Sequence, residues 1–146
     1  MLRAPELNAD HVDYAFLCAA RFFFLAFSNG DHEAWVSTIL GSENLFPGPD
    51  SAEQMRLALA VVQEMRIARG SCFRFSNPRC ANCTSVVTKD ERYLLQMVQH
   101  ARAGQRSKAV SSAMLLCEGN ATERVVAAAF GFAALFPQRV SERVGL

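Results

Sequence analysis

The sequence predicts an all-α fold, a compact bundle of about six helices with one irregular cysteine-containing loop at residues 71–87. Three observations support this prediction. Residues that start and stop helices recur at regular intervals, and no segment shows the strict apolar alternation of a half-buried strand. The length of 146 residues is typical of one domain. We therefore expect a single helical domain over residues 1–146.

The first half of the chain predicts three helices. Asn8 can cap the first, because its side chain can accept a hydrogen bond from a free backbone N–H of the first turn. Asp31 can cap a shorter second helix in the same way. Ser51 with Gln54 resembles a capping box at the start of the third. The expected helices cover about residues 8–27, 31–39 and 51–69.

The second half predicts three more helices. Thr88-Lys89-Asp90-Glu91 is the clearest capping box in the chain, and Gly104 is placed to end the helix that it starts. Asn120 with Glu123 resembles another such start. The expected helices cover about residues 88–102, 107–118 and 120–136.

The balance of charge argues against several classes of partner. The chain has 15 basic and 14 acidic side chains, so its formal net charge is +1. Such a chain has no general field to attract nucleic acid or an anionic membrane. It also lacks a glycine-rich phosphate loop and the G-x-S-x-G and H-E-x-x-H motifs. We expect a non-enzymatic protein that does not bind nucleic acid.

The first and last predicted helices are unusually apolar. The first contains the run "FLCAARFFFLAF" and the last the run "VVAAAFGFAALF". Arg21 interrupts the first run, which is too short for a membrane span and has no basic leader. Both helices can be buried centrally or can contact a protein partner or a second copy of the chain, and we favour central burial. We expect no membrane association and a cytoplasmic location.

Three of the five cysteines lie within twelve residues. Cys80-Ala81-Asn82-Cys83 is a C-x-x-C knuckle, a spacing at which two sulfurs can converge on one ion. Cys72 precedes it by eight residues, with Asn77-Pro78 as a turn between them. In a reducing compartment such clusters more often bind metal or perform redox chemistry than form permanent disulfides.

A closed tetrahedral metal site needs a fourth ligand. If the helices on either side of Gly104 form an antiparallel hairpin, Cys117 lies level with about residue 91, close to the end of the cysteine loop. His100 lies about 18 Å along its helix from Thr88 and points away. Cys18 is best explained as a buried thiol in an apolar helix. The predicted metal ligands are therefore Cys72, Cys80, Cys83 and Cys117.

Four thiolates suit zinc, with an iron–sulfur cluster as the second choice. The sequence thus favours a structural zinc site that supports an interaction or regulatory surface. One alternative is a thiol redox or iron–sulfur sensor protein that uses the C-x-x-C loop, and another is a plain helical subunit with ordinary buried cysteines. The knuckle followed by the capping box and "RYLLQMV" broadly resembles short bacterial proteins. That resemblance carries no functional residues over to this chain.

Overall fold

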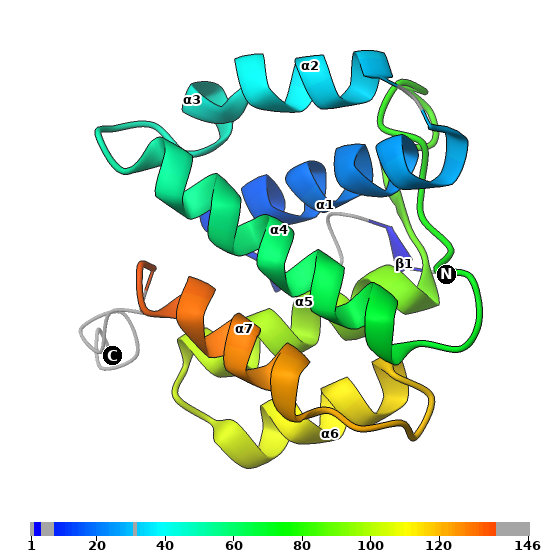
Figure 1. Cartoon of the computed structure of the whole chain (residues 1–146), viewed down its shortest axis with the longest axis vertical. Coiled ribbons are helices and arrows are strands. Elements are labelled where there is room, and N and C mark those ends of the chain that lie inside the picture. The colour runs from blue at the N-terminus through cyan, green and yellow to red at the C-terminus, as the bar shows by residue number, and fades with distance from the viewer. Residues whose placement is uncertain (1, 4–7, 31, 137–146) are drawn as a thin grey trace.

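The computed structural model describes residues 2–3, 8–30 and 32–136, and this part of the chain forms seven α-helices and two short strands (Figure 1). The predicted all-α class is confirmed, with one helix more than the six expected. The elements are β1 (Leu2–Arg3), α1 (His11–Asn29), α2 (His32–Leu40), α3 (Ser42–Leu45), α4 (Ser51–Ala68), β2 (Val86–Val87), α5 (Lys89–Arg102), α6 (Arg106–Leu116) and α7 (Glu123–Ala133).

The helices pack in three groups (Figure 1). Helices α2 and α3 cover one end of the molecule and lie over α1. The antiparallel hairpin of α5 and α6 forms the opposite end. Helices α4 and α7 pack against each other and lie between these two ends, so that α4 contacts α1 and α7 contacts α5. The irregular segment between α4 and α5 runs along the side of the molecule, next to β1.

Local hydrogen bonds explain where α1 begins. Asp10 accepts a hydrogen bond from the backbone N–H of Asp13 at 2.9 Å, and Asp13 accepts one from the N–H of Asp10 at 3.1 Å. This reciprocal pair is a capping box, so the prediction that Asn8 is the cap was wrong. The predicted cap of the second helix, Asp31, lies outside the described residues.

The other predicted capping boxes had different outcomes. The Thr88 box is confirmed, because the Thr88 hydroxyl accepts from the Glu91 N–H and the Glu91 carboxylate accepts from the Thr88 N–H, both at 3.0 Å. At α4, the buried Ser51 hydroxyl has no hydrogen-bond partner among the described residues. Helix α7 begins at Glu123, and the Asn120 amide instead donates to the Ala68 carbonyl at 2.8 Å. These two predicted boxes were therefore wrong.

Two small elements were not expected from the sequence. Helix α3 is a single turn within the predicted loop after α2. Strands β1 and β2 pair antiparallel, with Leu2 opposite Val87 and Arg3 opposite Val86. A two-residue pairing is too short to produce an alternating pattern, which explains why sequence periodicity does not reveal it.

Aromatic residues from distant parts of the chain form the centre of the core. Phe16 of α1 and Phe132 of α7 are fully buried, with ring centroids 5.1 Å apart. Phe46, which follows α3, packs its ring 5.9 Å from that of Phe132. Burial of one such side chain contributes about 1.5–3 kcal/mol. The large apolar residues of the sequence thus join three separate elements into one core.

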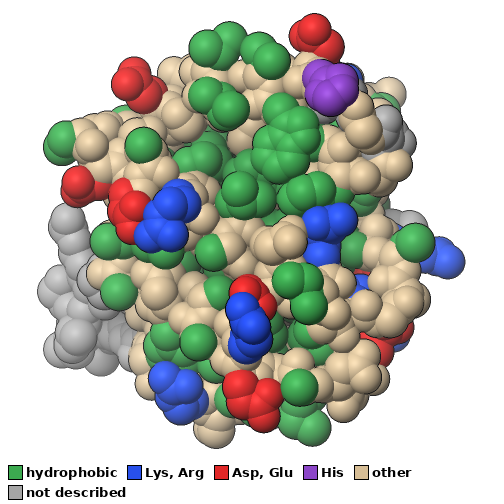
Figure 2. Space-filling model, viewed as in Figure 1, with side chains coloured by type: hydrophobic (Ala, Val, Ile, Leu, Met, Phe, Trp, Pro, Cys, Tyr) green, Lys and Arg blue, Asp and Glu red, His purple; other side chains and the backbone are tan. Residues whose placement is uncertain are grey.

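Helix α1 lies mostly inside this core. By length and composition, the window His11–Ser28 could cross a membrane, but 61% of it is buried against the rest of the chain. Core helices of water-soluble proteins meet the same criterion, so this is weak evidence for a span. Three of the exposed apolar side chains, Val36, Ile39 and Leu40, lie on α2. Figure 2 shows apolar side chains gathered around this end, and charges of both signs scattered over the rest of the face.

Candidate functional site

Cys80 and Cys83 form a disulfide in the segment between α4 and α5. The turn at Asn77-Pro78 is as predicted. The side-chain oxygen of Asn77 accepts a hydrogen bond from the Arg79 N–H at 2.9 Å, and the backbone carbonyl of Asn77 accepts one from the Cys80 N–H at 3.2 Å. The chain then makes one helical turn, in which the Cys80 carbonyl accepts from the N–H groups of Cys83 and Thr84, both at 3.1 Å. This turn brings the two sulfurs of the knuckle together.

A buried arginine holds the knuckle against α1. The Arg21 guanidinium donates to the Thr84 carbonyl at 2.9 Å and to the Val86 carbonyl at 3.0 Å. It also donates to both carboxylate oxygens of Glu91, at 2.6 and 3.0 Å. The Arg21 and Glu91 side chains are only 7% and 1% exposed. Removing these charges from water is costly, and the many hydrogen bonds offset that cost.

Glu91 also fixes the arm of the loop that precedes the knuckle. Its carboxylate accepts from the backbone N–H of Ser76 at 3.1 Å, in addition to its bonds from Arg21 and Thr88. The Ser76 hydroxyl donates to the Val86 carbonyl at 2.5 Å, which closes the loop on itself. The chain before the knuckle, at Ser76, and the chain after it, at Thr88, are therefore both held by one buried carboxylate at the start of α5.

The other end of the segment is held by a second arginine. Arg69 donates to the Leu116 carbonyl at 2.6 Å and to the Asp90 carboxylate at 3.4 Å. One guanidinium thus contacts both the end of α6 and the start of α5. This agrees with the prediction that Cys117 lies level with about residue 91 across the hairpin. The hairpin geometry that the sequence predicted is therefore present.

Glu118, next to Cys117, contacts the beginning of the same segment. Its carboxylate accepts from the Ser71 hydroxyl at 2.6 Å and from the backbone N–H groups of Ser71 and Gly70 at 2.9 and 3.1 Å. These hydrogen bonds, the Ser71 hydroxyl first among them, lower the pKa of Glu118. Glu118 also has a φ of 58°, a left-handed conformation that non-glycine residues rarely adopt. The carboxylate contacts hold the end of α6 to the start of the loop.

The predicted metal ligands are placed differently from one another. Cys80 and Cys83 are bonded together, Cys72 is exposed and Cys117 is fully buried, with a free thiol in each of the last two. Across the part of the chain that the structure describes, no three Cys, His, Asp or Glu side chains are grouped so that they could hold a metal ion. The four-cysteine site stays a prediction.

Cys18, which the sequence places in an apolar helix, lies close to the loop. It lines a cavity of about 200 Å³ together with Arg21, Pro78 and Thr84. Its thiol is partly buried, and this burial raises its pKa even though the Arg21 charge lowers it. Cys18 is therefore a weak nucleophile at neutral pH despite its position beside the knuckle.

No protein-family model, curated protein or solved structure matches this chain. In the sequence, Arg21 is a break in an apolar run and Glu91 is part of a capping box, and nothing local pairs them. A charged residue inside an apolar helix was the available signal, since a buried charge requires a partner. Only the fold identifies that partner as Glu91.

Two of the free thiols, those of Cys72 and Cys117, should differ in reactivity. We expect a thiol reagent such as 5,5′-dithiobis(2-nitrobenzoate) to modify Cys72 rapidly in the folded protein and Cys117 only after denaturation. Cys117 is fully buried, and this burial raises its pKa. Stopped-flow absorbance measures the phases, and Cys72→Ser is the control that removes the fast one. Rapid modification of Cys117 in the folded Cys72→Ser protein would contradict its placement.

Proposed function

We propose that the chain is a helical thiol–disulfide protein in which Cys80 and Cys83 alternate between a disulfide and a dithiol. The observation that supports this proposal is a bonded, partly exposed C-x-x-C pair held on a rigid bundle by the buried Arg21–Glu91 ion pair. A reactive pair on a fixed support can meet a partner without reorganising the fold. In a reducing compartment, such disulfides are typically transient and serve catalysis or sensing.

The backbone around the knuckle favours Cys80 as the reactive thiolate. The Cys83 N–H points at the Cys80 sulfur, with a nitrogen-to-sulfur distance of 3.3 Å. The N–H groups of Cys83 and Thr84 also donate to the Cys80 carbonyl, and these bonds fix the turn that holds the contact in place. A hydrogen bond donated to a sulfur favours its thiolate form. Cys83 lacks this support and is the second thiol of the pair.

The proposed reaction is exchange with a disulfide in a partner protein. The Cys80 thiolate attacks one partner sulfur, forms a mixed disulfide and releases the other partner sulfur as a thiolate. The Cys83 thiolate then attacks the Cys80 sulfur, re-forms the Cys80–Cys83 bond and releases the second partner thiolate. Two electrons pass to the partner disulfide, which becomes a dithiol. The reverse sequence, with a partner dithiol as reductant, returns the chain to its reduced form.

A redox titration tests this proposal. We expect the Cys80–Cys83 bond to be half reduced in thiol–disulfide buffers between about −300 and −180 mV. Many redox-active C-x-x-C proteins, and the glutathione pool of cells, have reduction potentials in this range. The two states are separated by alkylation and mass spectrometry. In the dithiol state, iodoacetamide should modify Cys80 several-fold faster than Cys83. The control is Cys72→Ser, which should leave the midpoint unchanged.

Two results would overturn the proposal. A bond that resists reduction throughout that range would be a structural disulfide. One zinc ion per chain after anaerobic purification without added metal, lost in both Cys80→Ser and Cys117→Ser, would instead support the predicted zinc site. Iron with the same dependence on these cysteines would support the cluster alternative.

A further inference from the structure

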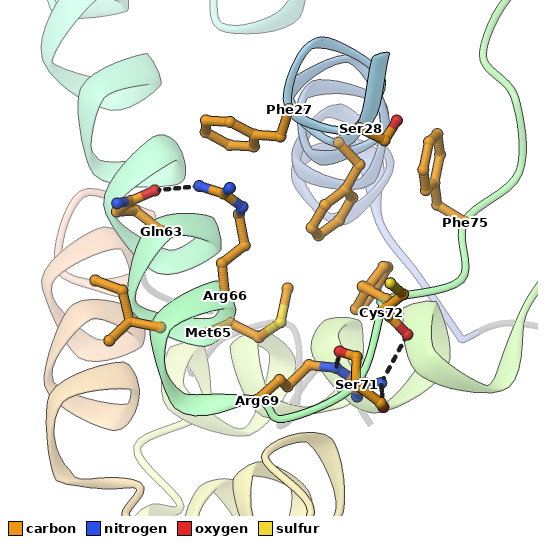
Figure 3. Close-up of a pocket in the computed structure, with 12 residues that line it drawn as sticks. Phe27, Ser28, Gln63, Met65, Arg66, Arg69, Ser71, Cys72 and Phe75 are labelled. Carbon is orange, nitrogen blue, oxygen red and sulfur yellow. Dashed lines mark hydrogen bonds between the residues drawn. The ribbon is translucent and has the colours of Figure 1, made fainter. Parts of the chain in front are cut away.

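One cavity lies away from the disulfide, between the second halves of α1 and α4 and the loop at residues 71–75 (Figure 3). Its volume is about 430 Å³. Pockets that bind small molecules usually measure about 300–1,000 Å³ and are lined mainly by apolar side chains, with a few polar groups for orientation. This groove meets both criteria.

Aromatic rings form the walls of the groove. Phe24 stacks on Phe73 with ring centroids 4.1 Å apart, and its ring lies 5.6 Å from that of Phe75. Phe73 and Phe75 are only partly buried, while Met65 behind them is fully buried. The groove therefore offers the partly exposed rings of Phe73 and Phe75, which lie over a fully buried part of the core.

Two arginines line the groove, and their charges are compensated differently. The Arg69 side chain is 6% exposed, is paired with Asp90 and donates to several backbone carbonyls. Arg66 is exposed, lies 3.7 Å from the centroid of the Phe27 ring and donates to the Gln63 amide oxygen at 2.8 Å. No described carboxylate pairs with Arg66, so a positive charge lies at the mouth of an apolar groove (Figure 3).

We propose that this groove binds a small carboxylate with an aromatic ring or a medium-length alkyl chain. The apolar part packs against the partly exposed rings of Phe73 and Phe75, and the carboxylate pairs with the Arg66 guanidinium. The fork of donors on a guanidinium matches the two oxygens of a carboxylate, and Phe27 with Gln63 limits its orientations. A cationic amphiphile would be repelled by Arg66, and a neutral one would gain only the apolar contacts.

The affinity should be modest, because Arg66 is exposed and water screens the ion pair. We expect 3-phenylpropionate to bind in the high-micromolar to millimolar range, about two- to fivefold more tightly than its neutral amide 3-phenylpropanamide. Two-dimensional NMR titration measures both constants. The signals that shift should include those of Phe24, Phe27 and Phe73.

Two arginine variants make the test specific. Arg66→Gln should reduce the affinity for 3-phenylpropionate to that for the amide. Arg106→Gln is the matched control, because Arg106 is also exposed and lies 4.3 Å from the centroid of a phenylalanine ring, that of Phe130, outside the groove. It should leave the preference for the carboxylate unchanged. Circular dichroism confirms that both variants are folded.

Three outcomes would overturn the inference. The first is the absence of saturable shifts at the groove with millimolar 3-phenylpropionate or octanoate. The second is equal binding of acid and amide, or of octanoate and octylamine, which would make the groove an apolar surface without selectivity for charge. The third is an equal loss of affinity in Arg66→Gln and Arg106→Gln. The redox state of Cys80 and Cys83 does not enter this test, so its failure leaves the thiol–disulfide proposal unaffected.

Discussion

Replacing Glu91 with alanine should lower the free energy of unfolding by about 3–5 kcal/mol, the usual cost of removing one partner from a buried ion pair. The substitution leaves the Arg21 guanidinium buried without its carboxylate, whose nearest oxygen is 2.6 Å from Arg21 Nε. It also removes the acceptor for the N–H groups of Ser76 and Thr88. Urea unfolding followed by circular dichroism measures the change.

Two controls separate the charge from the other contacts of Glu91. Glu91→Gln keeps the shape and some of the hydrogen bonds, so it should destabilise the fold less than alanine does. Glu53→Ala breaks an exposed ion pair with Arg56 on α4, and its effect should be too small to resolve. If Glu91→Ala were as mild as Glu53→Ala, the proposed support of the disulfide loop would be wrong. In that case the loop must be held by other contacts.

Replacing Arg102 with methionine should cost a similar amount, about 3–5 kcal/mol. Arg102 Nη1 lies 2.7 Å from Asp13 Oδ1 and 2.9 Å from Asp10 Oδ1, and its Nε donates to the Phe136 carbonyl at 2.6 Å. The Asp13 side chain is 2% exposed, so the variant leaves a buried carboxylate whose remaining side-chain donor is Gln99. Methionine preserves much of the apolar packing of the arginine stem.

The same variant should change the response of the protein to acid. Burial alone would raise the pKa of Asp10, but the hydrogen bonds from Arg102 and from the Asp13 N–H, together with the positive charge of Arg102, outweigh this and lower it below its ordinary value. When the pKa of a carboxyl group is lower in the folded than in the unfolded state, the group stabilises the fold at pH values above its unfolded pKa. That stability is lost as the pH falls through the folded pKa. In Arg102→Met the pKa of Asp10 should rise from its lowered value, so the part of this contribution that Arg102 supplies is lost.

Urea titrations at pH values from about 2 to 6 measure this difference. The free energy of unfolding should fall less with acid in Arg102→Met than in the wild-type protein. Arg106→Met removes an exposed arginine that no described carboxylate pairs with, so it should leave the pH dependence unchanged. An unaltered acid dependence in Arg102→Met would mean that Asp10 is not held by this arginine.

Local signals in the sequence determined most of the helices. The Thr88–Glu91 capping box and Gly104 each act within a few residues, and the structure confirms a helix between them. At α1, residue type alone favours Asn8 as the cap, whereas the structure uses Asp10, because Asp13 returns the hydrogen bond that Asp10 accepts. Helix α3 and the β1–β2 pairing are too short to produce a periodic pattern.

Some features of the candidate site could also be predicted from local sequence, and others could not. The C-x-x-C spacing was sufficient to predict that Cys80 and Cys83 meet, and the hairpin geometry placed Cys117 level with the start of α5. What the sequence did not reveal is that Arg21, 70 positions before Glu91, binds the carbonyls of Thr84 and Val86 and so holds the knuckle at α1. Cys72, at the other end of the loop, instead lines the groove beside α4.

By itself, the sequence determined the all-α class, the hairpin of α5 and α6 and the closeness of the two knuckle sulfurs, because each depends on residues close together in the chain or on a repeating apolar pattern. Only the tertiary structure decided which helix the knuckle contacts, which charges are buried together and where the aromatic groove forms. These features depend on pairs such as Arg21 and Glu91, whose encounter is set by the packing of the whole core.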